Sequence, residues 1–109
     1  MADLKFSPAF TRQLQKIHSH IEEDLARPCA AIETLESILN RISQLEQLPE
    51  IGSSLKTLYP KLSERFNATR LLICGRYAVI YDYEENLVSI LQIYHTKQDY
   101  IKHLLTSGI

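Results

Sequence analysis

Apolar residues in the first quarter of the chain recur at the spacing of a helix. The spacings are four, three and four residues, which places on one stripe Phe10, Leu14, Ile17 and Ile21. Ser7-Pro8 precedes this stretch and suits an N-cap followed by a first helical residue. Because residues 4–6 alternate apolar, polar and apolar, the pattern predicts a short strand and then an amphipathic helix that begins at Pro8.

A second apolar stripe follows Arg27-Pro28, where proline favours the end of one helix and the start of another. This stripe consists of Ile32, Leu35, Ile38, Leu39, Ile42 and Leu45. Pro49 and Gly52 indicate that the second helix has ended before them. Two amphipathic helices with a short joint form a helical hairpin, and its shared apolar face needs a further surface to cover it.

That surface is predicted in the last third of the chain, where three segments are rich in Ile, Leu, Val and Tyr. They are residues 70–74, 77–83 and 87–95. The breaks at 75–76 and 84–86 are short enough for hairpins, so the three segments predict an antiparallel meander. Tyr77, Val79, Tyr81 and Tyr83 share one face, and the last strand is apolar on both faces, so both faces of the sheet are expected to be partly covered.

The remaining stretches are predicted to be short connections and a closing helix. Residues 53–66 are expected to form a loop with room for one helical turn. Thr96 and Asp99 have the spacing of a capping box, which predicts a last helix through residues 100–105. With 109 residues the chain is long enough for one domain and too short for two, so the prediction is a single α+β domain.

Composition excludes several classes of protein. Hydrophobic residues make up 45% and charged residues 23%, as in ordinary globular proteins. No apolar run of membrane-spanning length occurs and the first residues, MADLKFSPAF, do not look like a signal peptide, so we expect a cytoplasmic protein without membrane contact. Cys29 and Cys74 lack metal-ligand spacing and are expected to be reduced, packed thiols. His18 and His20 cannot share a helix face, so no metal site is predicted.

Charge is distributed unevenly along the chain. Residues 1–50 carry five Lys and Arg against eight Asp and Glu, whereas residues 51–109 carry seven against five. The imbalance is sharpest in residues 51–76, where only Glu64 opposes Lys56, Lys61, Arg65, Arg70 and Arg76. This basic stretch is a candidate surface for an anionic target.

Three stretches of sequence carry a resemblance to a known family. The first, residues 4–14, is LKFSPAFTRQL, a strand followed by a helix with an early serine. The second, residues 48–52, is LPEIG, a Pro-x-x-Gly after the second helix. The third is GRYAVIYDY, residues 75–83, followed by ILQIYHTKQDY, residues 90–100, in which the second strand ends in a histidine and a polar run. In these stretches and in the order of its elements the chain resembles the RelE/ParE toxin superfamily over nearly its whole length.

The resemblance implies the toxin of a type II toxin-antitoxin system. Such a toxin arrests growth and is neutralised by a cognate antitoxin in a hetero-oligomer. Some relatives cleave messenger RNA in the ribosomal A site, ParE-type relatives poison DNA gyrase, and others have no established target. The resemblance therefore implies an antitoxin as partner and either ribosome-bound mRNA or gyrase as target, without a cofactor.

Cleavage of RNA without a metal needs a base, an acid and a cation beside the phosphate. His95 falls where the family pattern has a functional histidine in several nucleases, and imidazole suits acid or base chemistry near neutral pH. Arg70, Arg76 and Lys97 are candidates for phosphate contact, and Tyr81 and Tyr94 for base stacking or proton transfer. The alternatives are structural: a histidine at a strand end, surface cations or partners for antitoxin carboxylates, and tyrosines that only pack.

Two departures from the family pattern weigh against nuclease activity. Asp82 stands where a basic residue often follows the strand tyrosine, and Lys97-Gln98 stands where the pair is often basic. Fewer cations favour a protein target over RNA on the ribosome. They also motivate an alternative, an inert member of the superfamily that keeps only antitoxin binding. A third hypothesis is an unrelated small α+β adaptor.

Overall fold

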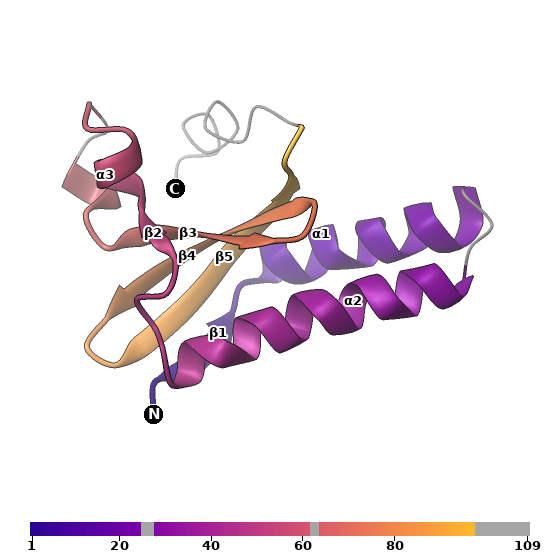
Figure 1. Cartoon of the computed structure of the whole chain (residues 1–109), viewed down its shortest axis with the longest axis horizontal. Coiled ribbons are helices and arrows are strands. Elements are labelled where there is room, and N and C mark those ends of the chain that lie inside the picture. Colours follow the sequence, from indigo (N-terminus) through magenta and orange to yellow (C-terminus); the bar gives the residue numbers. More distant parts are fainter. Residues whose placement is uncertain (25–27, 62–63, 98–109) are drawn as a thin grey trace.

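The computed structural model describes residues 1–24, 28–61 and 64–97. Within these ranges a helical hairpin packs against one face of a mixed sheet, and a short helix lies beside the other end of the sheet (Figure 1). This is the α+β architecture that the sequence predicts. None of the described helices is long and apolar enough to cross a membrane. The predicted closing helix at residues 100–105 lies outside the described residues.

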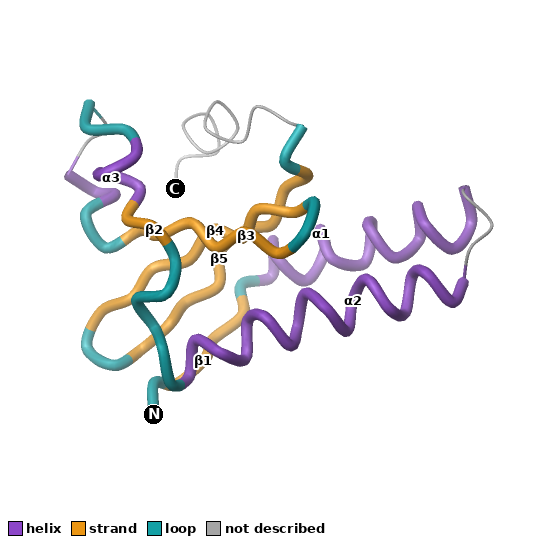
Figure 2. The backbone as a smooth tube through the Cα atoms, viewed as in Figure 1, coloured by secondary structure: helices purple, strands orange, loops and turns teal. Residues whose placement is uncertain are grey.

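The helical hairpin follows the predicted pattern closely. Helix α1 spans Pro8–Ser19, and the Ser7 side chain caps it by accepting a hydrogen bond from the Phe10 N–H at 3.0 Å. A π-helical turn, η1 at His20–Asp24, extends it. Helix α2 spans Pro28–Ser43 and ends in a 3₁₀ turn, η2 at Gln44–Glu46. The two helices run side by side beneath the sheet (Figure 2).

The described strands form a five-stranded sheet in the order β1-β5-β4-β3-β2. The predicted meander is confirmed as β3 (Thr69–Cys74), β4 (Tyr77–Glu84) and β5 (Leu87–His95). Strand β1 (Asp3–Phe6) pairs in parallel with β5. Strand β2 (Ser53–Ser54) pairs with β3 where the sequence predicts a loop, because two serines give no apolar alternation to reveal them. Helix α3 (Leu55–Leu58) and the 3₁₀ turn η3 (Glu64–Phe66) complete this stretch.

Both hairpin connections have two residues. Cys74 pairs with Tyr77 across Gly75, whose φ is 63°, and Glu84 pairs with Leu87. Glu85 and Asn86 between that pair have φ values of 51° and 62°, which is the geometry of a type I′ turn. Glu84 is therefore part of the strand and not of the predicted connection.

Both faces of the sheet are covered, as the sequence predicts. The helix-facing core contains Phe10, Ile38, Ile42, Leu45, Leu72, Val79, Tyr81, Val88, Ile90 and Ile93. On the opposite face Leu55 and Phe66 pack with Leu71, Ala78, Ile80 and Tyr94. Strand β5 contains a β-bulge. Ile80 pairs with Gln92 and Tyr81 pairs with Ile90, so Leu91 is an extra residue without a partner in β4. The bulge lets both Ile90 and Ile93 face the helices, although they are three residues apart.

Two expectations about burial were wrong. Ile32 and Leu39 of the predicted apolar stripe are 54% and 41% exposed, because the sheet covers a narrower strip of α2 than the sequence pattern occupies. Cys29, expected to be packed, is exposed near the start of α2, whereas Cys74 is buried.

Candidate functional site

The candidate residues from the sequence lie at two opposite ends of β3. Arg70 is near its start, and Arg76 is in the turn after its last residue, Cys74. Arg70 and Cys74 are about 13 Å apart along the strand at about 3.3 Å per residue. What each arginine can do is therefore decided by a different set of neighbours.

Arg70 holds a loop. Its Nε donates to the Gly52 carbonyl oxygen at 2.9 Å, and its Nη2 donates to the Glu50 carbonyl oxygen at 3.1 Å. Two of the donors that a phosphate would need are thus directed at backbone carbonyls. A phosphate would therefore have to compete with these two carbonyl groups for the Arg70 guanidinium.

Tyr81 holds the same loop from within the core. Its side chain is fully buried, its hydroxyl donates to the Pro49 carbonyl oxygen at 2.8 Å, and the Gly52 N–H donates to that hydroxyl at 3.0 Å. Burial raises the pKa of Tyr81, which keeps the hydroxyl protonated. Stacking on a base needs an exposed ring, and Tyr81 does not offer one. We call Arg70, Tyr81 and residues 49–52 the loop latch.

Glycine is required at position 52 by close packing. A Cβ there would lie 2.6 Å from the Tyr81 hydroxyl and 2.8 Å from the Leu71 carbonyl oxygen. The Pro-x-x-Gly stretch of the sequence is therefore the segment that the latch fixes.

The other basic candidates of residues 51–76 lie near the loop latch. Lys56 is in α3 and its Nζ donates to the Pro60 carbonyl oxygen at 3.5 Å, while Lys61 is exposed beyond that helix. Arg65 belongs to η3, but its side chain lies outside what the structure describes. Helix α3 stands beside β2, away from the β3–β4 turn (Figure 1). Lys56 and Lys61 therefore do not join Arg76 and His95.

Three of the candidates meet at the other end of the sheet. His95 pairs with Tyr77 across β5 and β4, with their ring centroids 5.4 Å apart and nearly perpendicular. The Thr96 N–H donates to the Arg76 carbonyl oxygen at 2.8 Å, and the Lys97 N–H donates to His95 Nδ1 at 3.1 Å. Arg76, His95 and Lys97 therefore gather around one turn.

A groove opens between this end of the sheet and the tip of the helical hairpin. Its larger part, of about 680 Å³, is lined by residues that include His20, Arg41, Cys74, Arg76, Tyr77 and His95. Its smaller part, of about 430 Å³, lies towards α1 and is lined by Gln13, Lys16, Ile17, His20, Tyr77, Ile93, Tyr94 and His95. The two parts share His20, Tyr77 and His95, and we call them together the sheet-end groove.

Burial shapes the acid-base character of the groove walls. It raises the pKa of Tyr94, partly offset by a hydrogen bond to Gln13, and it raises the pKa of Tyr77 despite Arg76 nearby. A tyrosine with a raised pKa gives up its proton less readily, so Tyr94 is poorly suited as an acid. Burial also raises the pKa of the Cys74 thiol to about 11, despite the nearby Arg41, so it stays protonated. Among the described residues no group of three or more His, Cys, Asp and Glu is placed to hold a metal.

The sequence of this chain matches, over residues 4–100, the family described as the ParE toxin of the type II toxin-antitoxin system parDE. The chain belongs to the ParE toxin family. No curated protein matches it in sequence.

Solved structures show the same ParE/RelE-like fold. One is the chromosomal ParDE toxin-antitoxin system from P. aeruginosa, with 20% identity and a TM-score of 0.68, covering 87% of this chain and 96% of that one. Another is the toxin-antitoxin complex RelBE2 from Mycobacterium tuberculosis, with 18% identity and a TM-score of 0.55, covering 86% and 96%. Together with the family match over residues 4–100, this fold confirms the superfamily resemblance seen in the sequence.

Sequence reasoning about this ParE-family chain missed the helix side of the groove. Lys16 and His20 come from α1 and η1, and Arg41 comes from α2. A signal was present, because Arg12, Lys16 and His20 are spaced by four residues and so share one face of a helix. The contribution of Arg41 depends on how the helices dock, which no local pattern records.

Proposed function

We propose that this ParE-family toxin acts in the cytoplasm by inhibiting DNA gyrase, and that a cognate antitoxin neutralises it in a hetero-oligomer. The observation that carries the proposal is the loop latch. Arg70 and Tyr81, two of the residues that RNA cleavage would recruit, are bonded to residues 49–52 at the end of the sheet away from His95. A protein target requires no such assembled catalytic set.

The remaining chemistry at the sheet-end groove supports the same proposal. RNA cleavage needs an acid, a base and a cation on one phosphate. His95, Arg76 and Lys97 lie together, but Tyr94 is 8% exposed and its raised pKa weakens it as an acid. Asp82, at the position where relatives are often basic, accepts a hydrogen bond from the Thr69 hydroxyl at 2.5 Å.

The apolar side chains left open on α2 support an antitoxin partner. Ile32 and Leu39 are seven residues apart, so they lie on one face of the helix, and both are well exposed. An amphipathic segment of the antitoxin that folds on binding would bury them. The two solved structures similar in fold are described as toxin-antitoxin systems.

Induction of the chain in bacteria tests the target. We expect growth arrest with DNA damage and intact mRNA, restored growth when the antitoxin is co-expressed, and inhibition of supercoiling by purified gyrase. The His95→Ala variant should still arrest growth. Loss of mRNA on induction, abolished by His95→Ala, would show instead that the chain is a nuclease.

Two alternatives have observations in their favour. The grouping of His95, Arg76 and Lys97 beside a groove favours a metal-free, ribosome-dependent endoribonuclease. The diversion of Arg70 and Tyr81 into the loop latch is also compatible with an inert member that keeps only antitoxin binding. Normal growth on induction, together with a stable antitoxin complex, would identify the inert member.

A further inference from the structure

We propose that the sheet-end groove and the adjoining face of α1 bind the phosphate backbone of nucleic acid, and specifically duplex DNA. This inference rests on the proposed function, because gyrase acts on duplex DNA and an inhibitor bound to it meets that DNA. The surface consists of Arg12, Lys16 and His20 on the helix side and of Arg76 and His95 on the sheet side.

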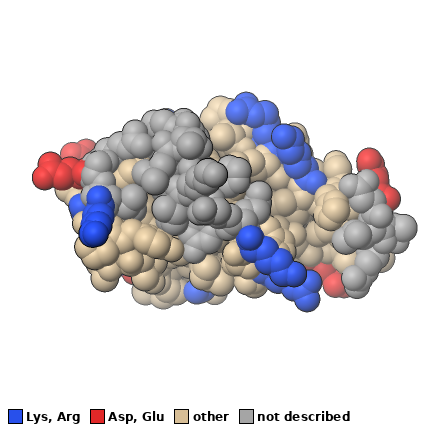
Figure 3. Space-filling view, turned by 90° about the horizontal axis from the view of Figure 1, so that it is seen from above, with Lys and Arg blue, Asp and Glu red and all other residues tan. Residues whose placement is uncertain are grey.

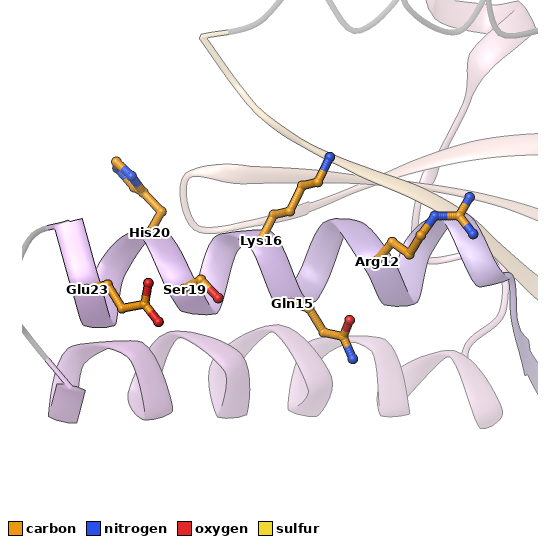
Figure 4. Close-up of a pocket in the computed structure, with 6 residues that line it drawn as sticks. All are labelled: Arg12, Gln15, Lys16, Ser19, His20 and Glu23. Carbon is orange, nitrogen blue, oxygen red and sulfur yellow. The ribbon is translucent and has the colours of Figure 1, made fainter.

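The helix side is a row of evenly spaced basic side chains. Arg12, Lys16 and His20 follow one another at intervals of four residues, or about 6 Å along a helix. They leave the helix on one side, towards the sheet, whereas Gln15, Ser19 and Glu23 leave it on another (Figure 4). The row lies on a rigid helix, so binding costs little ordering of the backbone.

Overlapping hollows join this row to the sheet. Arg12, Lys16 and His20 line a shallow hollow on α1, and Lys16 and His20 also line the smaller part of the sheet-end groove. His20 and His95 then border the larger part, which Arg76 closes at the β3–β4 turn. One ligand that lies along the surface can therefore meet every basic group in it.

Three cations of this surface are outside the ion pairs of the described residues. Among the described residues Arg12, Lys16 and Arg76 form no ion pair, whereas His18 pairs with Glu22 at 3.3 Å on a neighbouring side of the helix. Arg41, in contrast, is a wall of the groove, because its Nη1 donates to Gln44 at 2.7 Å and its Nε to the Ile73 carbonyl oxygen at 3.4 Å.

The acidic residues that line the surface are few. Glu23 lines the hollow on α1, and Glu33 lines the larger part of the sheet-end groove. Seen from above, separate groups of basic side chains lie on this face of the molecule, and the most prominent acidic side chains lie towards its two ends (Figure 3). Separate groups of cations suit a long anion better than a single small one.

The spacing and the kinds of side chain favour a phosphate backbone over an acidic polypeptide. A DNA duplex carries about one negative charge per 1.7 Å of its axis, so cations about 6 Å apart each find a phosphate. The guanidinium groups of Arg12 and Arg76 match phosphate oxygens in pairs. The carboxylates of an acidic peptide have no such fixed repeat.

The test measures fluorescence anisotropy of a labelled duplex with the full-length chain at several salt concentrations. For three neutralised phosphates, log K should fall with log salt at a slope of roughly −2.7, from −0.9 per phosphate. In the variant Arg12→Gln/Lys16→Gln/Arg76→Gln we expect binding about tenfold or more weaker and a slope near zero. Circular dichroism and antitoxin binding establish that the variant is folded.

A matched control removes three charges elsewhere. Lys5→Gln/Lys56→Gln/Lys61→Gln changes the net charge by the same amount but leaves the proposed surface intact, so its binding should equal that of the unaltered chain. A second variant, Arg12→Lys/Lys16→Arg/Arg76→Lys, keeps all three charges and should keep most of the binding. Equal weakening in the control and in the first variant would overturn the proposal, because net charge alone would then explain the effect.

Two further probes identify the ligand. Single-stranded RNA of the same sequence should bind more weakly than the duplex, and polyglutamate should compete poorly. RNA that binds more tightly than DNA, or polyglutamate that competes as well as DNA, would overturn the proposal.

The outcome also separates this inference from the proposed function. If the first variant binds DNA as tightly as the unaltered chain and the unaltered chain inhibits gyrase, the inference fails and the gyrase proposal stands. If the chain binds DNA and leaves gyrase active, the gyrase proposal fails and the DNA surface stands.

Discussion

At one end of β3, Arg70 and Tyr81 are bonded to backbone atoms of residues 49–52, whereas at the other end Arg76 and Tyr77 face a groove. Both pairs combine an arginine with a tyrosine, so residue type alone does not separate them. The difference is the loop at residues 49–52, which lies only at the Arg70 end and whose carbonyl groups require hydrogen-bond donors. An arginine beside unpaired loop carbonyls therefore stabilises the fold, whereas an arginine without such neighbours can bind a ligand.

The Gly52→Ala variant should have the largest effect, because it tests the packing of the loop latch directly. The added Cβ would collide with the Tyr81 hydroxyl and a β3 carbonyl, so we expect a loss of about 3 kcal/mol in the free energy of unfolding. Urea denaturation measures it. Gly75→Ala is the matched control: nothing lies within 4 Å of its added Cβ, and its φ of 63° should cost only about 1 kcal/mol. Equal losses in both variants would mean that the loop latch is not tightly packed.

Alkaline pH tests the burial of Cys74, which lines the sheet-end groove. The unfolded Cys74 thiol loses its proton from its ordinary pKa of 9.0, while the folded thiol keeps it up to about 11. The unfolded state is therefore favoured as pH rises, and stability should fall by about 2 to 3 kcal/mol between these values, at about 1.4 kcal/mol per unit. Urea denaturation across this range should show a shallower decline for Cys74→Ala. Parallel declines would show that Cys74 is not the group responsible.

Removing one hydroxyl tests the loop latch more gently. Tyr81→Phe leaves the Gly52 N–H and the Pro49 carbonyl without their partner, which should cost about 2 kcal/mol. In Tyr83→Phe, where the side chain is only partly buried, the loss should stay below about 0.5 kcal/mol. Thermal unfolding of both variants makes the measurement. A loss for Tyr81→Phe as small as that for Tyr83→Phe would count against the latch.

The smallest expected changes in stability come from replacing each of the two arginines. Arg70→Gln removes two hydrogen bonds to the loop at a partly buried position and should cost about 1 kcal/mol. Arg76→Gln removes an exposed side chain and should change stability by less than about 0.5 kcal/mol, while it weakens DNA binding. Urea denaturation measures the stability of both variants, and the anisotropy assay measures their DNA binding. The comparison fails if Arg76→Gln is the more destabilising of the two.

Local patterns in the sequence were sufficient for most of the elements. The stripe from Phe10 to Ile21 and the serine and proline before it place α1, and the apolar runs after Thr69 place the three strands of the meander. These features depend on residues close together in the chain, which is where periodicity carries information. The bulge at Leu91 and the pairing of Ser53–Ser54 were not predictable, because they are set by distant strands.

The candidate site was less predictable, for a physical reason. Whether Arg70 or Tyr81 is available depends on residues 49–52, which approach only in the folded chain. His95 lies close to Arg76 because the β4–β5 hairpin places it opposite Tyr77, the residue after Arg76. The helix side of the groove needed the docking of α1 on the sheet, although the spacing of Arg12, Lys16 and His20 was visible from the start.

Strand β1 pairs in parallel with β5, and the Ser7 hydroxyl donates to the Leu91 carbonyl oxygen, 84 residues further along the chain. During translation the first strand therefore leaves the ribosome long before its partner is synthesised. The hairpin of helices has no complete sheet to pack on until the final strand emerges, and contacts so far apart in sequence form slowly. A nascent chain thus spends most of its synthesis without a finished toxin fold.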